Sequence, residues 1–259
     1  MTIRGTWIGV AVFAFGMLAL PADFSSAQAQ GPAIEPEAMQ LLKRMTDFLG
    51  GAQEFGVEAE NWLEDVSVSG EKIQYGFTSD LKIKRPDRLR AERTAYRSKQ
   101  EFLYDGKTLT IYDPATNHYA SEAAPDNIDE LLHFARDTLD IVPPVGDLVF
   151  TNAYDLLTSQ ITSAKVVGKA LLDGVVCDHL AFTSPLVDWQ VWISEGDKPL
   201  PYRYVLTTMD DPAYPQYTVT MSNWNLDLKF DKEVFEFAMP AGATEIDFLR
   251  IDAEPSSAP

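Results

Sequence analysis

The chain has 259 residues, a formal net charge of -18 and one cysteine, Cys177. The acidic balance argues against nucleic acid as a partner, because nucleic-acid binding depends on cationic side chains that neutralise phosphates. A single cysteine excludes an intramolecular disulfide. A chain of this length can bury a core by packing alone.

The N-terminus predicts a cleavable signal peptide at residues 1–29. A short basic start precedes an apolar stretch from Trp7 to Leu20, which is shorter than the roughly 20 residues that a membrane-spanning helix needs. Ala27-Gln28-Ala29 matches the small-x-small pattern that precedes signal peptidase cleavage. We therefore expect cleavage after Ala29 and a periplasmic location. The alternative is an N-terminal helix that is buried or anchors the chain.

The mature chain opens with a helical pattern and continues as strands. Apolar residues at i, i+3 and i+4 spacing predict an amphipathic helix from Pro36 to Leu49, ended by Gly50-Gly51. From Gly56 to Tyr119, apolar and polar residues alternate, which is typical of half-buried strands. We predict six strands in an antiparallel meander. The turn-forming residues between them are Gly70, Pro86-Asp87, Asp105-Gly106 and Asp113-Pro114.

Two helices are predicted in the middle of the chain, at 128–139 and 148–161, before strands return after Lys165. Strands in blocks, rather than alternating with helices, exclude a doubly wound sheet and favour an α+β fold. We predict one domain at residues 30–250, a large curved antiparallel sheet with helices on one face, and a flexible tail at 251–259. The later strand patterns lie at 166–168, 175–182, 189–193, 202–208 and 217–228.

Residues suited to catalysis or metal binding are few. Cys177 and His179 lie two apart on an expected strand and face the same side, but a metal site needs three or four ligands and no third is identifiable nearby. Nucleophile-elbow, zincin, dinucleotide and Walker motifs are missing. We expect no catalytic residue, no metal and no cofactor. A hydrolase that uses His133 or His179 stays open as an alternative, because a triad is defined by geometry.

A basic cluster lies within this acidic chain. Lys82 and Lys84 share one face of an expected strand, and Arg88 and Arg90 share one face of the next. One interpretation is a positive stripe that binds anionic head groups or an acidic partner. The other is a solvated sheet face whose charges protect it from aggregation.

Apolar and aromatic residues suggest a ligand site. Aromatic residues make up 11% of the chain, and an apolar sheet face beneath helices forms a cleft suited to a lipid or acyl chain. Ordinary core packing is the alternative. Trp189 and Trp192, three apart on a strand, face opposite sides. The residues expected to contact a ligand are Trp62, Phe77, Leu131, Phe134, Trp189 and Trp192.

Several segments resemble known envelope families. Asp105 to Pro114 is similar to a strand-turn-strand segment of LolA-type periplasmic lipoprotein carriers. A wider resemblance, over most of the mature chain, is to a family of predicted periplasmic proteins, domain of unknown function 2092. It implies a LolA-like half-barrel of antiparallel strands closed by helices on the concave face, and it brings no known activity. The segments that carry it are Arg85–Arg90, Asp105–Lys107, Asp173–Leu180, Asp188–Ile193 with Pro199–Pro201, and Phe235–Ala243.

These patterns together predict a non-enzymatic periplasmic carrier or binding protein. Its expected partner is a hydrophobic small molecule, a lipid or a lipoprotein acyl chain, held between sheet and helices. The alternative from another class is an envelope interaction or sensor module that docks a protein or a membrane through the basic stripe.

Overall fold

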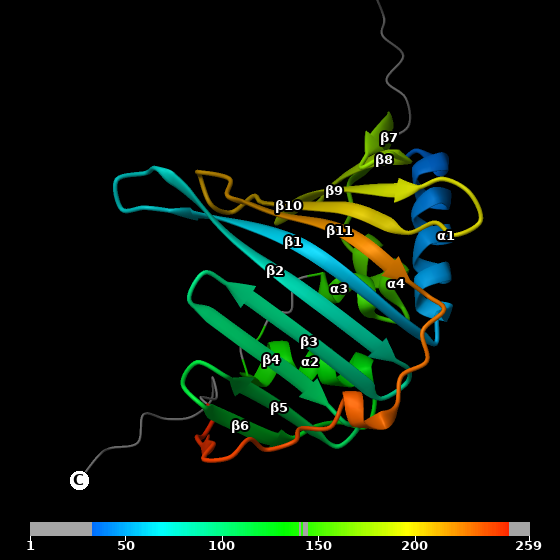
Figure 1. The fold of residues 1–259 in the computed structure, drawn as a ribbon. Coiled ribbons are helices and arrows are strands. Elements are labelled where there is room, and N and C mark those ends of the chain that lie inside the picture. Colours follow the sequence, from blue (N-terminus) through cyan, green and yellow to red (C-terminus); the bar gives the residue numbers. More distant parts are fainter. Residues whose placement is uncertain (1–32, 140, 142–144, 249–259) are drawn as a thin grey trace, which may run out of the picture. The chain divides into compact units, whose positions relative to one another are not determined.

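The computed structural model describes residues 33–139, 141 and 145–248 (Figure 1). The predicted signal peptide and the tail at 251–259 lie outside these residues. The helices are α1 (Pro36–Gly51), α2 (Ile128–Leu139), α3 (Gly146–Val149), α4 (Ala153–Thr158) and the 3-10 turn η1 (Lys232–Val234). The strands are β1 (Glu54–Val66), β2 (Lys72–Lys84), β3 (Arg88–Ala95), β4 (Ser98–Tyr104), β5 (Thr108–Asp113), β6 (His118–Ala123), β7 (Ser163–Leu172), β8 (Val175–Thr183), β9 (Val187–Ser194), β10 (Pro201–Thr208), β11 (Gln216–Asn225) and β12 (Thr244–Glu245).

All twelve of these strands belong to one sheet, in the order β12-β6-β5-β4-β3-β2-β1-β11-β10-β9-β8-β7. Every neighbouring pair is antiparallel except β12 and β6. The sheet is open, because β12 and β7 are its two edges. The predicted meander of six strands is confirmed in β1–β6, and a second meander follows in β7–β11. The two are joined where β1 pairs with β11, with Ala59 opposite Met221.

The helices α2, α3 and α4 lie on one face of this sheet, behind the strands in Figure 1, and α1 runs along the right-hand side of the view. Alternate residues of β1, Phe55, Val57 and Ala59, are buried toward them. Helix α2 turns its apolar side to the same core, and the helix α1 packs against β7, β9, α3 and α4. Burying one face of the sheet under the apolar sides of the helices stabilises both layers. The predicted fold, a large curved antiparallel sheet with helices on its concave face, is confirmed.

Two local predictions differ from the structure. The single helix expected at 148–161 is wrong, because the chain breaks between α3 and α4. Phe150 adopts an extended backbone (φ -56°, ψ 143°) and its side chain is buried, so the chain turns there to place an apolar ring in the core. The turn at Tyr96-Arg97 between β3 and β4 was not predicted, since neither residue has the usual turn chemistry.

After β11 the chain crosses the convex face of the sheet as a strap, which we define as residues 226–248 (Figure 1). The Phe230 carbonyl accepts a hydrogen bond of 2.6 Å from Lys84 Nζ. Farther on, the Phe237 ring lies 5.0 Å from the ring of Tyr119. Near its end the strap forms β12, which pairs with β6 and makes one edge of the sheet. It therefore covers part of the sheet face opposite the helices.

Candidate ligand-binding cavity

A cavity of about 410 Å³ lies between the concave face of β1–β5 and the helices α2 and α3. This volume is within the range of roughly 300–1,000 Å³ typical of ligand pockets. Most of its wall is aliphatic or aromatic. The strands contribute Val57, Leu81, Leu89, Ala91, Phe102 and Ile111, and the helices contribute Leu131, Leu132, Ala135 and Val149.

The strand register explains how these residues come to share one wall. Val57 of β1 lies opposite Leu81 of β2, which lies opposite Ala91 of β3, and Ala91 lies opposite Phe102 of β4. Directly opposite residues point to the same face of an antiparallel sheet. Small side chains line the space between the layers, among them Ala91 on the sheet and Ala135 on α2. A large side chain at either position would occupy volume that the two alanines leave open.

One end of the cavity is polar. Ser79, Arg93 and Gln100 line it from neighbouring strands, together with Glu92, and the register places Arg93 opposite Ser79 and Gln100. The guanidinium carbon of Arg93 lies 4.2 Å from the centroid of the Phe77 ring. The wall therefore changes from apolar to polar along each of the strands β2, β3 and β4.

A buried amide supports this polar end. Asn61 is fully buried and donates hydrogen bonds to the Ala59 carbonyl at 3.3 Å and to Ser79 Oγ at 3.0 Å. Its side-chain oxygen accepts a hydrogen bond from the Tyr217 hydroxyl. Burial raises the pKa of Tyr217 well above its usual value, while the charge of Arg93 lowers it in part. A neutral tyrosine is thus kept as a donor to Asn61.

Of the six residues predicted to contact a ligand, the structure brings Leu131 to the cavity wall. Phe134 on the same helix is half-buried and packs against the core. Phe77 faces the concave side, beneath Arg93. Trp62 lies on the convex face, 40% exposed, with its ring against Gly76.

The two other predicted tryptophans lie in the second meander, away from the cavity wall. Trp189 is buried and stacks on Phe182 at a centroid distance of 3.9 Å. Trp192 points to the other face and stacks on His179 at 4.0 Å. Aromatic content did not indicate the cavity because most of its wall is aliphatic. The sequence signal that marks the cavity is the alternation of apolar residues along β2–β5, which includes the small residue Ala91.

The histidines proposed for catalysis have other contacts. His179 Nε2 lies 2.9 Å from Gln190 Oε1, and His133 Nδ1 lies 2.9 Å from an Arg136 nitrogen. Cys177 is buried, and this burial raises the pKa of its thiol to about 11. Within the described part of the chain, no three His, Cys, Asp or Glu residues are placed to hold a metal ion.

The basic cluster lies on the convex face, where Lys82 and Lys84 share one face of β2 and Arg88 and Arg90 share the same face of β3. Lys82 lies opposite Arg90, and Lys84 lies opposite Arg88. Each of the four is paired with a carboxylate, so the stripe is not a surplus of positive charge. The pairs are Lys82 with Asp80, Lys84 with Glu54, Arg88 with Asp87, and Arg90 with Glu92 and Glu101.

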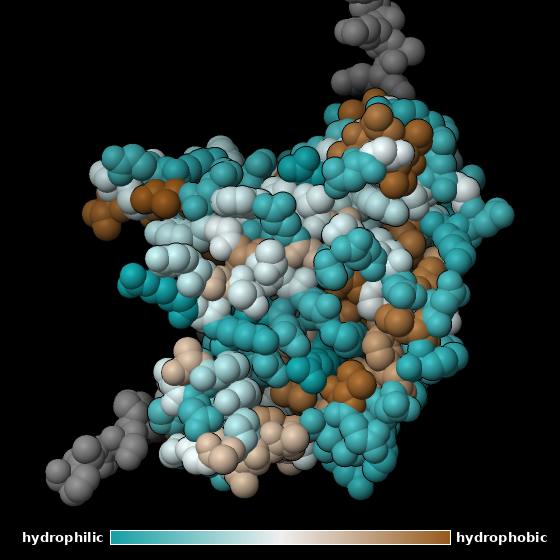
Figure 2. Space-filling view, in the orientation of Figure 1, coloured by the Kyte–Doolittle hydropathy of each residue, from teal (hydrophilic) through white to brown (hydrophobic). Residues whose placement is uncertain are grey.

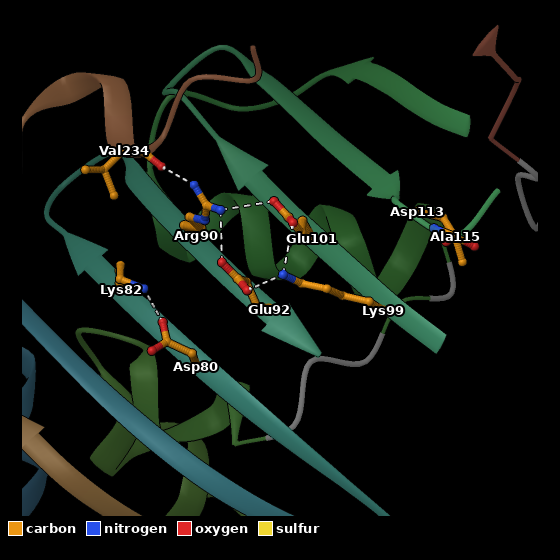
Figure 3. A network of polar contacts seen from close by, with 9 residues as sticks. All are labelled: Asp80, Lys82, Arg90, Glu92, Lys99, Glu101, Asp113, Ala115 and Val234. Atoms are coloured by element: carbon orange, nitrogen blue, oxygen red, sulfur yellow. Dashed lines mark hydrogen bonds and ion pairs between the residues drawn. The ribbon is translucent and has the colours of Figure 1, made fainter. Parts of the chain in front are cut away.

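The densest of these contacts form a network on β3 and β4 (Figure 3). Glu92 and Glu101 lie directly opposite each other, which repels on its own. Arg90 bonds both carboxylates, at 2.9 and 3.0 Å, and Lys99 bonds both from the other side, at 2.9 and 3.3 Å. Burial opposes the ionisation of Glu92, but hydrogen bonds from Lys99 and Arg90 lower its pKa overall. The network balances its own charge.

The convex face around this network is hydrophilic over much of the area that Figure 2 presents. Arg90 also donates a hydrogen bond of 3.3 Å to the Val234 carbonyl of the strap. These contacts fit the interpretation of a solvated, charge-balanced sheet face better than that of a positive docking stripe. Of the helices in the described ranges, none combines the length and the apolarity required to cross a bilayer.

Comparisons with known proteins identify a family. The family model described as "Predicted periplasmic protein (DUF2092)" matches residues 38–249. Comparison with curated proteins finds no match.

Several solved structures are similar in fold at low sequence identity. Lipoprotein LppX of Mycobacterium tuberculosis is 14% identical, with a TM-score of 0.49 over 76% of this chain and 100% of that one. LprF of Mycobacterium bovis is 14% identical, with a TM-score of 0.46 over 82% and 100%. A LolA superfamily protein of Nitrosomonas europaea is 11% identical, with a TM-score of 0.36 over 77% and 97%.

Proposed function

Because the chain belongs to the family of predicted periplasmic proteins DUF2092, we propose that it is a non-enzymatic periplasmic carrier or binding protein. Its ligand is apolar, a lipid or an acyl chain, and lies between the sheet and the helices α2 and α3. The observation that carries this proposal is the cavity of about 410 Å³ with its mostly apolar wall.

An empty apolar cavity is unfavourable in a folded protein. Interiors are close-packed, with few voids larger than a water molecule, and an apolar void lowers stability because its lining loses contacts. Water gains little there, since it needs several polar partners. An acyl chain replaces the missing contacts and gains about 0.8 kcal/mol for each methylene buried. The cavity therefore favours an apolar occupant.

Two measurements test the proposal. Native mass spectrometry of the protein purified from its own cell envelope is expected to show added mass from a retained lipid. A displacement assay with a fluorescent apolar probe is expected to report binding, and Ala91→Phe should weaken it at least tenfold by filling the cavity. Thr94→Phe adds a ring to the same strand on an exposed position outside the cavity wall, and should leave binding unchanged.

The proposal fails if the purified protein carries no lipid and no apolar probe binds. It also fails if Ala91→Phe folds, as judged by its circular dichroism, and binds the probe as tightly as the wild type. Equal weakening by Ala91→Phe and Thr94→Phe would place the probe outside the cavity.

A further inference from the structure

We propose that the ligand of this cavity is an anionic amphiphile whose head group is bound by Arg93 at the polar end. This inference rests on the proposed function and names the class of ligand. The shared chemistry of the head group is a carboxylate or phosphate oxygen, and the apolar tail occupies the cavity.

Arg93 differs from the other cations of β2–β4 in its partners. Lys82, Arg90 and Lys99 each lie within 4.0 Å of a carboxylate on the convex face. Arg93 points to the concave face, and no carboxylate of the described residues forms an ion pair with it. Among the described residues, the charge of Arg93 is therefore available to bind a ligand.

The guanidinium is held in place by a ring. It lies over Phe77 at 4.2 Å from the ring centroid, a cation–π geometry that orients the planar group. Phe77 is itself buried, 8% exposed, so its ring is a fixed support. Stacking engages a face of the guanidinium, and its N–H donors radiate in the plane of the group. A planar fork of donors matches a carboxylate or phosphate in two parallel hydrogen bonds.

Two neutral donors flank Arg93 in the same row. Ser79 Oγ accepts a hydrogen bond from Asn61, which leaves its own O–H to donate. The side-chain amide of Gln100 makes no hydrogen bond to another described residue. Ser79, Arg93 and Gln100 thus present donors from three adjacent strands at one end of the cavity.

The apolar part of the cavity wall begins at the next inward-facing residue along each strand after the polar row. Leu81, Ala91 and Phe102 form the next row toward the helices, about 7 Å along the strands from the polar row. A head group at Arg93 therefore places the first methylenes of its tail over Ala91. The chain carries a formal net charge of -18 and repels anions at long range. Binding of an anionic head group therefore requires a specific cation in the site, and Arg93 supplies it.

The test compares ligands with the same tail and different head groups in the displacement assay. Wild type should bind palmitate roughly tenfold or more tightly than cetyl alcohol, since hydrogen bonds to a charged group add to tail burial. Arg93→Gln should abolish that preference, because it lowers the affinity for palmitate far more than the affinity for cetyl alcohol. Arg93→Lys should retain part of it. The matched control is Arg97→Gln, because Arg97 lies in the adjacent turn over Tyr96 and outside the cavity wall.

Two arms separate the sources of the anion. Tridecanoate and dodecyl phosphate share a dodecyl tail, so the ligand that binds more tightly identifies a fatty acid or a phosphate-bearing lipid as the better fit. The inference is wrong if wild type binds palmitate and cetyl alcohol equally, or if Arg93→Gln and Arg97→Gln have equal effects; binding of both ligands would still support the carrier function. If neither ligand displaces the probe, both the inference and the proposed function fail.

Discussion

At the scale of single residues, Asn61 is the side chain on which the polar end of the cavity depends. It is fully buried and links Ser79 to Tyr217 across three strands. Asn61→Ala leaves the Tyr217 hydroxyl without this acceptor, and we expect it to lower the free energy of unfolding by about 1–3 kcal/mol. Tyr217→Phe alone should cost less, and in the double variant the two losses should not add. Urea unfolding of the four proteins measures this coupling, and simple additivity would contradict it.

The buried thiol of Cys177 predicts a pH dependence. Its pKa is raised to about 11 because burial disfavours the thiolate, so the unfolded chain releases this proton at lower pH than the folded chain. The thiol of Cys177 makes its full contribution to the free energy of unfolding below about pH 9, and this contribution is lost as the pH rises toward about 11. Cys177→Ala should flatten the fall in unfolding free energy over that interval. A residual slope is expected from Tyr104, whose burial raises its pKa to about 12; an unchanged slope would contradict the prediction.

At the scale of elements, the strap is held to the convex face by the basic cluster. Arg90 joins the Glu92 and Glu101 carboxylates to the Val234 carbonyl, with its side chain 25% exposed. Arg90→Met keeps the aliphatic stem and removes the donors, and should lower the free energy of unfolding by about 1–2 kcal/mol. Limited proteolysis should then cut within residues 226–248 sooner than in the wild type.

A surface ion pair provides the control for that prediction. Lys43 and Asp47 form an exposed pair four residues apart on α1, so Lys43→Met should change stability little. Equal effects of Lys43→Met and Arg90→Met would show that Arg90 does not hold the strap. Binding to anionic vesicles should be the same for wild type and Arg90→Met, because Arg90 is already paired; a loss of binding would favour the docking module instead.

At the scale of the whole molecule, the cavity predicts how affinity depends on tail length. Each buried methylene contributes about 0.8 kcal/mol, so two more methylenes should tighten binding roughly tenfold. This gain should stop when the tail exceeds the cavity of about 410 Å³. Displacement by a series of fatty acids measures the break point. Affinity that rises without a limit would indicate micelles or a flat surface rather than a cavity of limited volume.

Ligand binding should also stabilise the folded chain. A ligand present at about a hundred times its dissociation constant adds about 2.7 kcal/mol to the free energy of unfolding. Thermal unfolding with and without palmitate measures this gain, and Ala91→Phe, in which the cavity is filled, should show much less of it. An equal gain in both proteins would contradict binding in the cavity.

The sequence by itself determined much of the local structure. Its period-two alternation and turn residues determined most of the strands, because the pleat sends alternate side chains to opposite faces whatever the partner strand is. The face shared by Lys82 and Lys84, and the face shared by Arg88 and Arg90, followed from the same rule. The break at Phe150 did not, because burial of that ring in the core overrides the local helical pattern.

Only the tertiary structure decided the candidate site. The pairing of β1 with β11 joins segments more than 150 residues apart, and small side chains from distant elements, among them Ala91 and Ala135, line the same cavity. Most of the aromatic residues that were expected to contact a ligand lie in the core or on the surface instead. The sequence does not distinguish Arg93 from the neighbouring cations, and only the tertiary structure shows it beside the cavity, without an ion pair among the described residues. Which side chains meet across layers depends on long-range packing, and periodicity along one strand carries no information about that.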